Sequence, residues 1–161
     1  MPQPPTAKRI RYFAYKARRK AEIIAKKDGF QKNLSNFCAR GSAILHAELE
    51  KAGYSPKIYF FPGHIYVHCE GYYVDITAAQ FSPKIGRTVV RKESTIEQLN
   101  KISRRWEIKW AKWTCNGPQE VRDKQDEIGW HMEKGKVQDS DWKEPQQLCL
   151  TLPEPKIYTL F

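Results

Sequence analysis

Residues 35–81 constrain the fold more than any other part of the chain, because a helical pattern and three strand-like runs follow one another there. Apolar residues recur at helical spacing over 37–51, and Ala52-Gly53 is typical of a helix end. Three runs rich in β-branched and aromatic residues then have the length of short strands: 57–61, 64–69 and 72–77. We therefore predict an α+β fold in which a helix packs on an antiparallel sheet.

Glu70-Gly71 separates the last two runs and has the form of a two-residue hairpin turn. Such a turn fixes the register, because the residues on its two sides then face each other in order. His64 and Asp75 become diagonal neighbours on one face of the hairpin, with backbones about 7–8 Å apart. His68 is also diagonal to Asp75, so the register leaves both histidines as partners of the carboxylate.

Cys38 falls in the first turn of the predicted helix 37–51, with Ser35 or Asn36 as its N-cap. Backbone N–H groups are unpaired at a helix start and the helix dipole is positive there, which favours a thiolate. A thiol nucleophile, an imidazole base and an orienting carboxylate form a set that supports nucleophilic catalysis. The alternative is that Cys38 is one more buried free cysteine.

The N-terminal segment carries most of the excess positive charge of a chain whose net charge is +10. Residues 1–27 hold nine of the 28 basic residues and one of the 18 acidic ones. Apolar residues at three- and four-residue steps predict a helix over 7–27, ended by Asp28-Gly29. Its basic side chains predict either a solvated face or a site for an acidic partner or nucleic acid, with these residues as candidates: Arg18, Arg19 and Lys20.

Beyond residue 81 the sequence predicts further sheet and helices. Residues 82–92 read as a basic loop, and Cys115 as part of a turn. Helices are expected at 95–103 and 119–134, and strands at 106–110 and 148–152. We expect a single domain over 1–161, with a basic helix at 1–29, a catalytic core motif at 30–81 and the remaining sheet and helices at 82–161.

Composition limits the compartment and the cofactors. No apolar run approaches the about 18 residues that span a membrane, and the N-terminus has no apolar core of a secretion signal. The four cysteines are far apart and form no CxxC pair, which favours reduced thiols in the cytoplasm over disulfides or a zinc site. We expect no cofactor, no metal and no membrane partner.

Three segments resemble the transglutaminase-like branch of the papain-like cysteine hydrolases: FCARGSAILHAELEKAGY, GHIYVH and YYVDITAAQF. The likeness covers about residues 31–81. It implies a papain-like core in which Cys38 is the nucleophile, His64 rather than His68 is the base, and Asp75 holds the histidine. Papain-like enzymes also use a glutamine before the cysteine to bind the oxyanion, and Gln31 is the nearest match, one residue further away.

The resemblance implies a cysteine hydrolase that cleaves a peptide or carboxamide bond through a thioester, as a peptidase or deamidase. Its partner would be a protein or peptide substrate. Two alternatives stay open: an acyl transferase of the transglutaminase type, and a non-enzymatic protein that binds nucleic acid or an acidic partner through the basic N-terminal helix.

Overall fold

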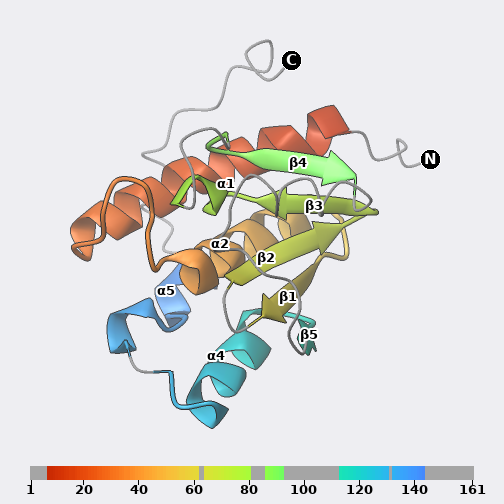
Figure 1. Ribbon diagram of the computed structural model, residues 1–161. Coiled ribbons are helices and arrows are strands. Elements are labelled where there is room, and N and C mark those ends of the chain that lie inside the picture. Colours follow the sequence, from red (N-terminus) through yellow and green to blue (C-terminus); the bar gives the residue numbers. More distant parts are fainter. Residues whose placement is uncertain (1–6, 62–63, 81–85, 93–112, 131, 144–161) are drawn as a thin grey trace.

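The computed structural model describes residues 7–61, 64–80, 86–92, 113–130 and 132–143, and their fold is α+β (Figure 1). A five-stranded antiparallel sheet has the strand order β4-β3-β2-β1-β5. Its strands are β1 (Lys57–Phe61), β2 (His64–Cys69), β3 (Tyr72–Asp75), β4 (Val89–Lys92) and β5 (Trp113–Cys115). The helices are α1 (Ala7–Lys27), α2 (Cys38–Lys51), α4 (Pro118–Glu127) and α5 (Asp139–Trp142), with 3-10 turns η1 (Ala78–Gln80) and η3 (Glu133–Gly135).

The β2–β3 hairpin has the predicted register. Cys69 pairs with Tyr72, and the next pairs follow in order along both strands. Glu70 and Gly71 form the turn with φ angles of 52° and 79°. Positive φ at both central residues is the backbone of the hairpin turn that matches the twist of the strands. The turn therefore places His64 and Asp75 at the same end of the hairpin and on one face.

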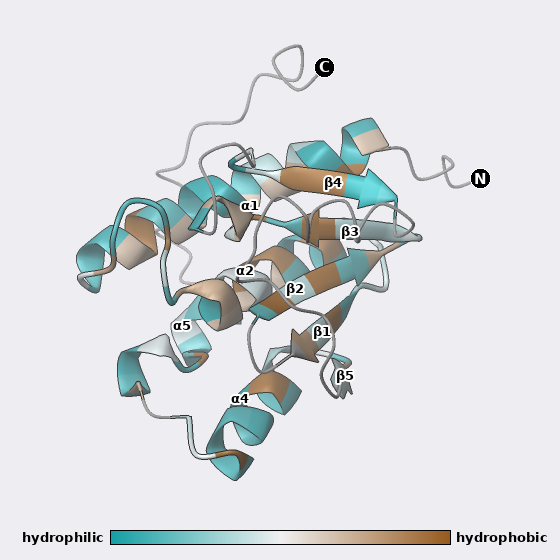
Figure 2. Cartoon of the chain, in the orientation of Figure 1, coloured by the Kyte–Doolittle hydropathy of each residue, from teal (hydrophilic) through white to brown (hydrophobic). Residues whose placement is uncertain are grey.

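Helices α1 and α2 lie together on one side of the sheet (Figure 1). Leu45 and Leu49 of α2 join Ile65, Val67 and Val74 of the strands in one buried core. Helix α1 contributes mainly alanines to this core: Ala14, Ala17, Ala21 and Ala25. Small side chains allow the two helix axes to approach closely. Hydrophobic residues accordingly concentrate in the strands, whereas the outer turns of α1 and α4 are hydrophilic (Figure 2).

Gly41 lies where the segment after β3 crosses α2. A Cβ atom at this position would be 2.7 Å from Thr77 Cγ2, which is closer than real Cβ contacts. The next residue, Ser42, donates a hydrogen bond to the Ile65 carbonyl at 3.1 Å. The small residues after Cys38 therefore allow α2 to lie directly against β2 and against the segment that follows β3.

Four local predictions were wrong. Residues 89–92 form β4 within the expected loop, because Val89 and Val90 pair with β3. Cys115 ends β5 and pairs with Ile58 instead of lying in a turn. Helix α4 ends at Glu127 rather than near residue 134. No side chain of Ser35 or Asn36 caps α2, whose N-cap is Phe37.

The end of α4 has a specific cause. Gly129 takes a φ of 71°, and Trp130 N–H donates to the Gln125 carbonyl at 2.9 Å. This six-residue bond, with a left-handed residue inside it, closes a helix in the Schellman manner. The elements expected at 95–103, 106–110 and 148–152 lie outside the described residues. Among the helices of the described part, none is long and apolar enough to cross a membrane.

Candidate active site

Three elements bring the predicted residues to one place. Cys38 is the first residue of α2, His64 the first of β2 and Asp75 the last of β3. His64 and Asp75 are 1% and 2% exposed, and Cys38 is 8% exposed. The His64 Nε2 atom lies 2.5 Å from Asp75 Oδ2, so of the two histidines that the hairpin register left open, His64 is the one bonded to the carboxylate.

The Asp75 carboxylate accepts hydrogen bonds on both oxygens. Oδ2 accepts from His64 and from the Tyr73 hydroxyl at 2.6 Å, and Oδ1 accepts from the N–H and hydroxyl of Thr77 at 2.7 and 3.1 Å. Burial alone would raise the pKa of Asp75, but the charge of His64 and these hydrogen bonds lower it. Asp75 is therefore held as a carboxylate inside the protein.

The contact with Asp75 also determines the protonation of His64. Burial opposes protonation of the imidazole, but the charge and hydrogen bond of Asp75 outweigh it and raise the pKa of His64 to about 9. The nearby Cys38 side chain adds to this increase. Because Nε2 is bonded to Asp75, Nδ1 is the ring nitrogen that remains for the sulfur. His64 thus stands between a carboxylate and a thiol, and it carries a proton at neutral pH.

Tyr73 was not singled out from the sequence, although the period of two along β3 already places it on the same face as Asp75. Its side chain is fully buried and its hydroxyl donates to the oxygen that His64 also contacts. Burial first, and then the neighbouring charge of Asp75, raise the pKa of Tyr73 well above its ordinary value. Tyr73 is therefore a permanent hydrogen-bond donor to the carboxylate.

The loop ahead of Cys38 has an unusual backbone. Leu34 and Asn36 both have positive φ, 61° and 67°, which costs energy for residues other than glycine. Gln80 holds this loop, because its Oε1 accepts from Asn36 N–H at 3.2 Å and its Nε2 donates to the Thr77 carbonyl at 3.0 Å. Gln80 thereby ties the approach to Cys38 to the segment that follows Asp75. No local sequence signal marks this role.

His68 and Gln31 do not join the cluster. The His68 ring stacks on Tyr59, with ring centroids 5.1 Å apart and planes 5° from parallel, and Asp75 bonds to His64 instead. Gln31 is exposed and lines a pocket beside α1. Its carbonyl accepts from Leu34 N–H at 3.0 Å, and no hydrogen bond to the cluster is found among the described residues. An oxyanion role for Gln31 stays a prediction.

The expected partner-binding surface on α1 needs correction. Arg18 and Lys20 are each 4% exposed, and only Arg19 is half-buried on the helix flank. Arg18 donates to the Ile76 carbonyl at 2.6 Å, and Lys20 pairs with Glu48 of α2. Alanines flank the two positions on α1, Ala17 before Arg18 and Ala21 after Lys20. Arg18 and Lys20 are therefore engaged in contacts within this chain and are not exposed on the helix surface.

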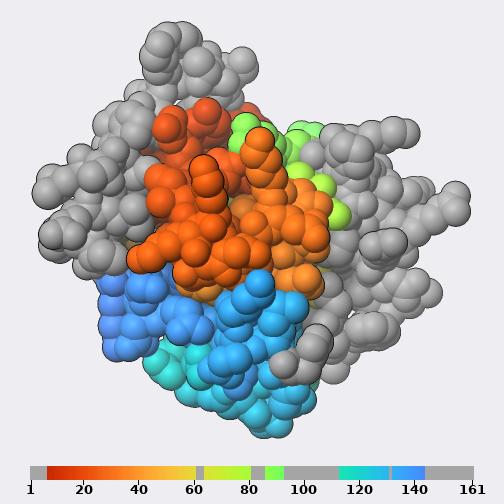
Figure 3. All heavy atoms as spheres, turned by 90° about the vertical axis from the view of Figure 1, so that its left-hand side faces the viewer, coloured from red at the N-terminus to blue at the C-terminus, as the bar shows by residue number. Residues whose placement is uncertain are grey.

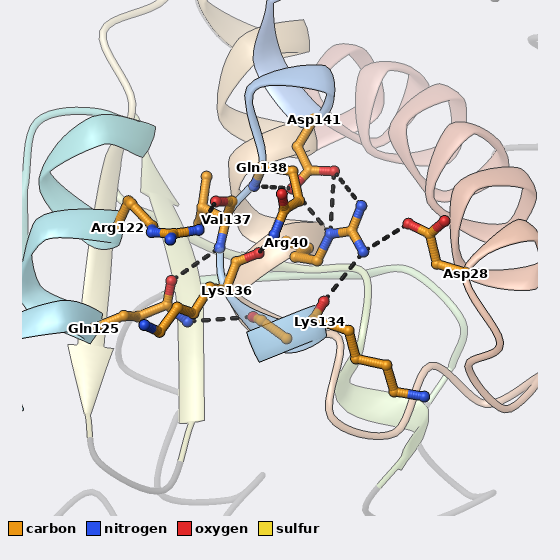
Figure 4. A network of polar contacts seen from close by, with 10 residues as sticks. Asp28, Arg40, Arg122, Gln125, Lys134, Lys136, Val137, Gln138 and Asp141 are labelled. Atoms are coloured by element: carbon orange, nitrogen blue, oxygen red, sulfur yellow. Dashed lines mark hydrogen bonds and ion pairs between the residues drawn. The ribbon is translucent and has the colours of Figure 1, made fainter. Parts of the chain in front are cut away.

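A second buried network supports α2 from its other side (Figure 4). Arg40, two residues after Cys38, donates to Asp141 of α5 through Nε and Nη2 at 3.1–3.3 Å. It also pairs with Asp28 at 2.8 Å and donates to the Lys134 carbonyl at 3.2 Å. Its guanidinium packs on Phe37, 5.1 Å from the ring centroid. The first turn of α2 is thus fixed by the end of α1 and by α5.

The other described cysteines are in different surroundings. Burial, with the charge of Glu70, raises the pKa of Cys69 to about 12. Burial, with the charge of Glu120, also raises the pKa of Cys115. Within the described residues, no group of three or more His, Cys, Asp and Glu side chains is arranged to hold a metal ion.

Fold and site together define an α+β protein with a cysteine, a histidine and an aspartate clustered where a helix starts and a hairpin ends. Comparisons with protein-family models, curated proteins and solved structures found no significant match to this chain.

Proposed function

We propose that the protein is a cysteine hydrolase that cleaves a peptide or carboxamide bond through a thioester. The observation that carries the proposal is the position of His64, whose Nε2 is 2.5 Å from Asp75 where β2 starts and β3 ends, with Cys38 at the start of α2 as the neighbouring thiol. A carboxylate that fixes the imidazole, and an imidazole that shares its proton with a thiol, are the parts that nucleophilic catalysis requires.

The chemistry starts from the protonated imidazole of His64 and the thiolate of Cys38. The thiolate attacks the carbonyl carbon and forms the S–C bond. The resulting oxyanion is bound by backbone N–H groups at the start of α2, that of Cys38 first. His64 gives its proton to the leaving nitrogen, so the C–N bond breaks and a thioester remains. His64 then takes a proton from water, which attacks the thioester, releases the acid and restores the thiolate.

Acyl transfer to an amine shares every step up to the thioester, so a transglutaminase-type reaction is the nearest alternative. Hydrolysis is preferred because it needs no binding site for a second substrate. Binding of nucleic acid or an acidic protein through α1 is less favoured, because Arg18 and Lys20 are buried in contacts with this chain.

Incubation with a panel of protein substrates, followed by mass spectrometry, tests the proposal. A backbone cut splits the substrate and adds a water, deamidation adds about one dalton, and transfer joins two chains. We expect Cys38→Ala to reduce the rate by about three orders of magnitude or more. Cys115→Ala, which also truncates a buried thiol, serves as the control and should keep its activity. Equal activity of Cys38→Ala and the wild type would overturn the proposal.

A further inference from the structure

The C-terminal half of α1 and the loop after it enclose a pocket of about 680 Å³. This volume is within the range of about 300–1,000 Å³ that ligand pockets occupy. The lining residues come from α1, from the loop 30–34, from η1 and from the start of the β4 segment. These segments meet on the face shown in Figure 3, where the end of α1 and the following loop lie above the segment 133–143.

The lining combines apolar side chains, which we call the apolar floor, with cationic ones. Ala25, Phe30, Leu34 and Ala79 supply apolar surface. Four cationic side chains line the pocket against one carboxylate, Glu22: Arg18, Lys26, Lys32 and Arg87. Glu22 already pairs with Arg18 and Arg87. The pocket lining therefore carries a net positive charge, because its described residues include four cations and one carboxylate.

Lys26 and Lys32 supply that excess charge. Both are exposed, and neither forms an ion pair with a residue in the described part of the chain. Lys26 stands in the last turn of α1, and Lys32 in the loop that leads to Cys38. A ligand with one or two carboxylates next to an apolar group would satisfy both lysines and cover the apolar floor.

The walls of this pocket are the segments that hold the catalytic cluster. Arg18 donates from the pocket to the carbonyl of Ile76, the residue after Asp75, and to the carbonyl of Lys32. Leu34 lies in the loop that approaches Cys38, and Ala79 in the turn after Asp75. Gln80 hydrogen-bonds these two segments together. A ligand in the pocket would therefore lie beside the residues that position Cys38 and Asp75.

We propose that this pocket binds an acidic segment of the peptide substrate, with an apolar side chain on the floor and carboxylates bound by Lys26 and Lys32. The inference rests on the proposed hydrolase function and names its substrate class. A peptide fits better than a free phosphate, because a phosphate would leave the apolar floor uncovered. The proximity of the pocket to both loops of the cluster is what a segment flanking the cleaved bond requires.

Binding is measured first, without turnover. A fluorescent peptide of alternating leucine and glutamate, and its counterpart with glutamine in place of glutamate, are titrated with the Cys38→Ala protein by fluorescence anisotropy. Lys26→Gln/Lys32→Gln should weaken binding of the acidic peptide about tenfold. Lys27→Gln/Lys51→Gln is the matched control, because it also removes one lysine from the last turn of α1 and one other exposed lysine. The control should bind like its parent.

A second measurement links the pocket to the cluster. Saturating acidic peptide should protect Cys38 of the wild type from iodoacetamide, and the glutamine peptide should not. Equal affinity for both peptides, or equal losses in both double variants, would overturn the pocket assignment. Binding without protection would overturn its assignment to the substrate. Failure of the hydrolase proposal would give a different result. Cys38 would then be unreactive towards iodoacetamide even without peptide, while the difference in peptide binding would remain.

Discussion

Asp75 depends on the residues that donate to it. Its two oxygens accept four hydrogen bonds, and Tyr73 and His64 share Oδ2. A buried carboxylate with so many donors stays ionised and can adopt only one orientation. The hydroxyl of Tyr73 thus orients the group that orients His64, although it does not contact the thiol.

Removing that hydroxyl tests this arrangement. Tyr73→Phe keeps the buried ring and deletes one donor to a charged acceptor, so we expect a loss of about 1.5–3 kcal/mol in the free energy of unfolding. The pKa of Asp75 should rise, because one of the bonds that lower it is gone. Urea denaturation between pH 3 and 7 measures both effects. Tyr72→Phe, on the other face of β3, is the control, and an equal loss there would contradict the role of Tyr73.

The residue pair could be predicted because strands repeat every two residues. Once Glu70-Gly71 is taken as a two-residue turn, His64 and Asp75 must share a face. The same arithmetic cannot separate His64 from His68, since both are diagonal to Asp75. In the structure His68 stacks on Tyr59 of β1, a strand whose pairing the hairpin register does not include.

At the scale of elements, the site depends on the crossing of α2 and the segment after β3. Gly41 allows this crossing, because a Cβ atom would come within 2.7 Å of Thr77 Cγ2. Thr77 also donates its N–H and hydroxyl to Asp75. The approach of the helix that carries Cys38 to the segment that follows Asp75 is therefore limited at this point by the Thr77 side chain.

Gly41→Ala should destabilise the protein, although alanine favours a helix by up to about 1 kcal/mol over glycine. The added methyl group overpacks the crossing, at a cost of about 1–3 kcal/mol. Thr77→Ser removes Cγ2 and keeps the hydroxyl, so Gly41→Ala/Thr77→Ser should recover most of the loss. Thermal unfolding of the two variants and of Thr77→Ser alone measures the rescue. Additive losses in the double variant would show that the contact does not limit the crossing.

The ends of several helices and strands in this chain were easier to predict than the contacts that their side chains make. Strands β1 and β2 and the end of α1 lie where the pattern of apolar residues and glycines placed them. The burial of Arg18 and Lys20 was not predictable, because a basic residue on a predicted helix is expected to face solvent unless its partners in the fold are known. Those partners, Ile76 and Glu48, are 58 and 28 residues away along the chain.

At the scale of the whole molecule, long-range polar contacts complete what the hairpin begins. Arg40 and Asp141 are separated by 101 residues, yet their ion pair fixes the first turn of α2 (Figure 4). The sequence contains no local pattern that marks this pair, since the stabilisation that the pair provides depends on its burial by α1, α2 and α5 together. The position of Cys38 therefore depends on contacts that form only in the folded chain, and the local sequence motif does not determine it.

The His64–Asp75 pair predicts how stability depends on pH. The folded pKa of His64, about 9, exceeds its ordinary 6.5, so its contribution is complete below pH 6.5 and is lost as pH rises towards 9. The pKa of Asp75 lies below its ordinary 3.8, so its contribution is present above that value and is lost as pH falls further. Urea denaturation from pH 3 to 10 should give a difference between wild type and Asp75→Asn that is largest from about pH 4 to 6.5. A difference independent of pH would contradict the ion pair.

The most direct test of the central claim is the rate at which iodoacetamide alkylates Cys38 as a function of pH, followed by peptide mass mapping. We predict fast labelling of Cys38 from about pH 6 to 8, where Cys69 and Cys115 stay unreactive because burial raises the pKa of both. His64→Gln should remove this labelling. Labelling of Cys38 that rises only near pH 8.5, as for a free thiol, and at the same rate in His64→Gln, would contradict the catalytic pair.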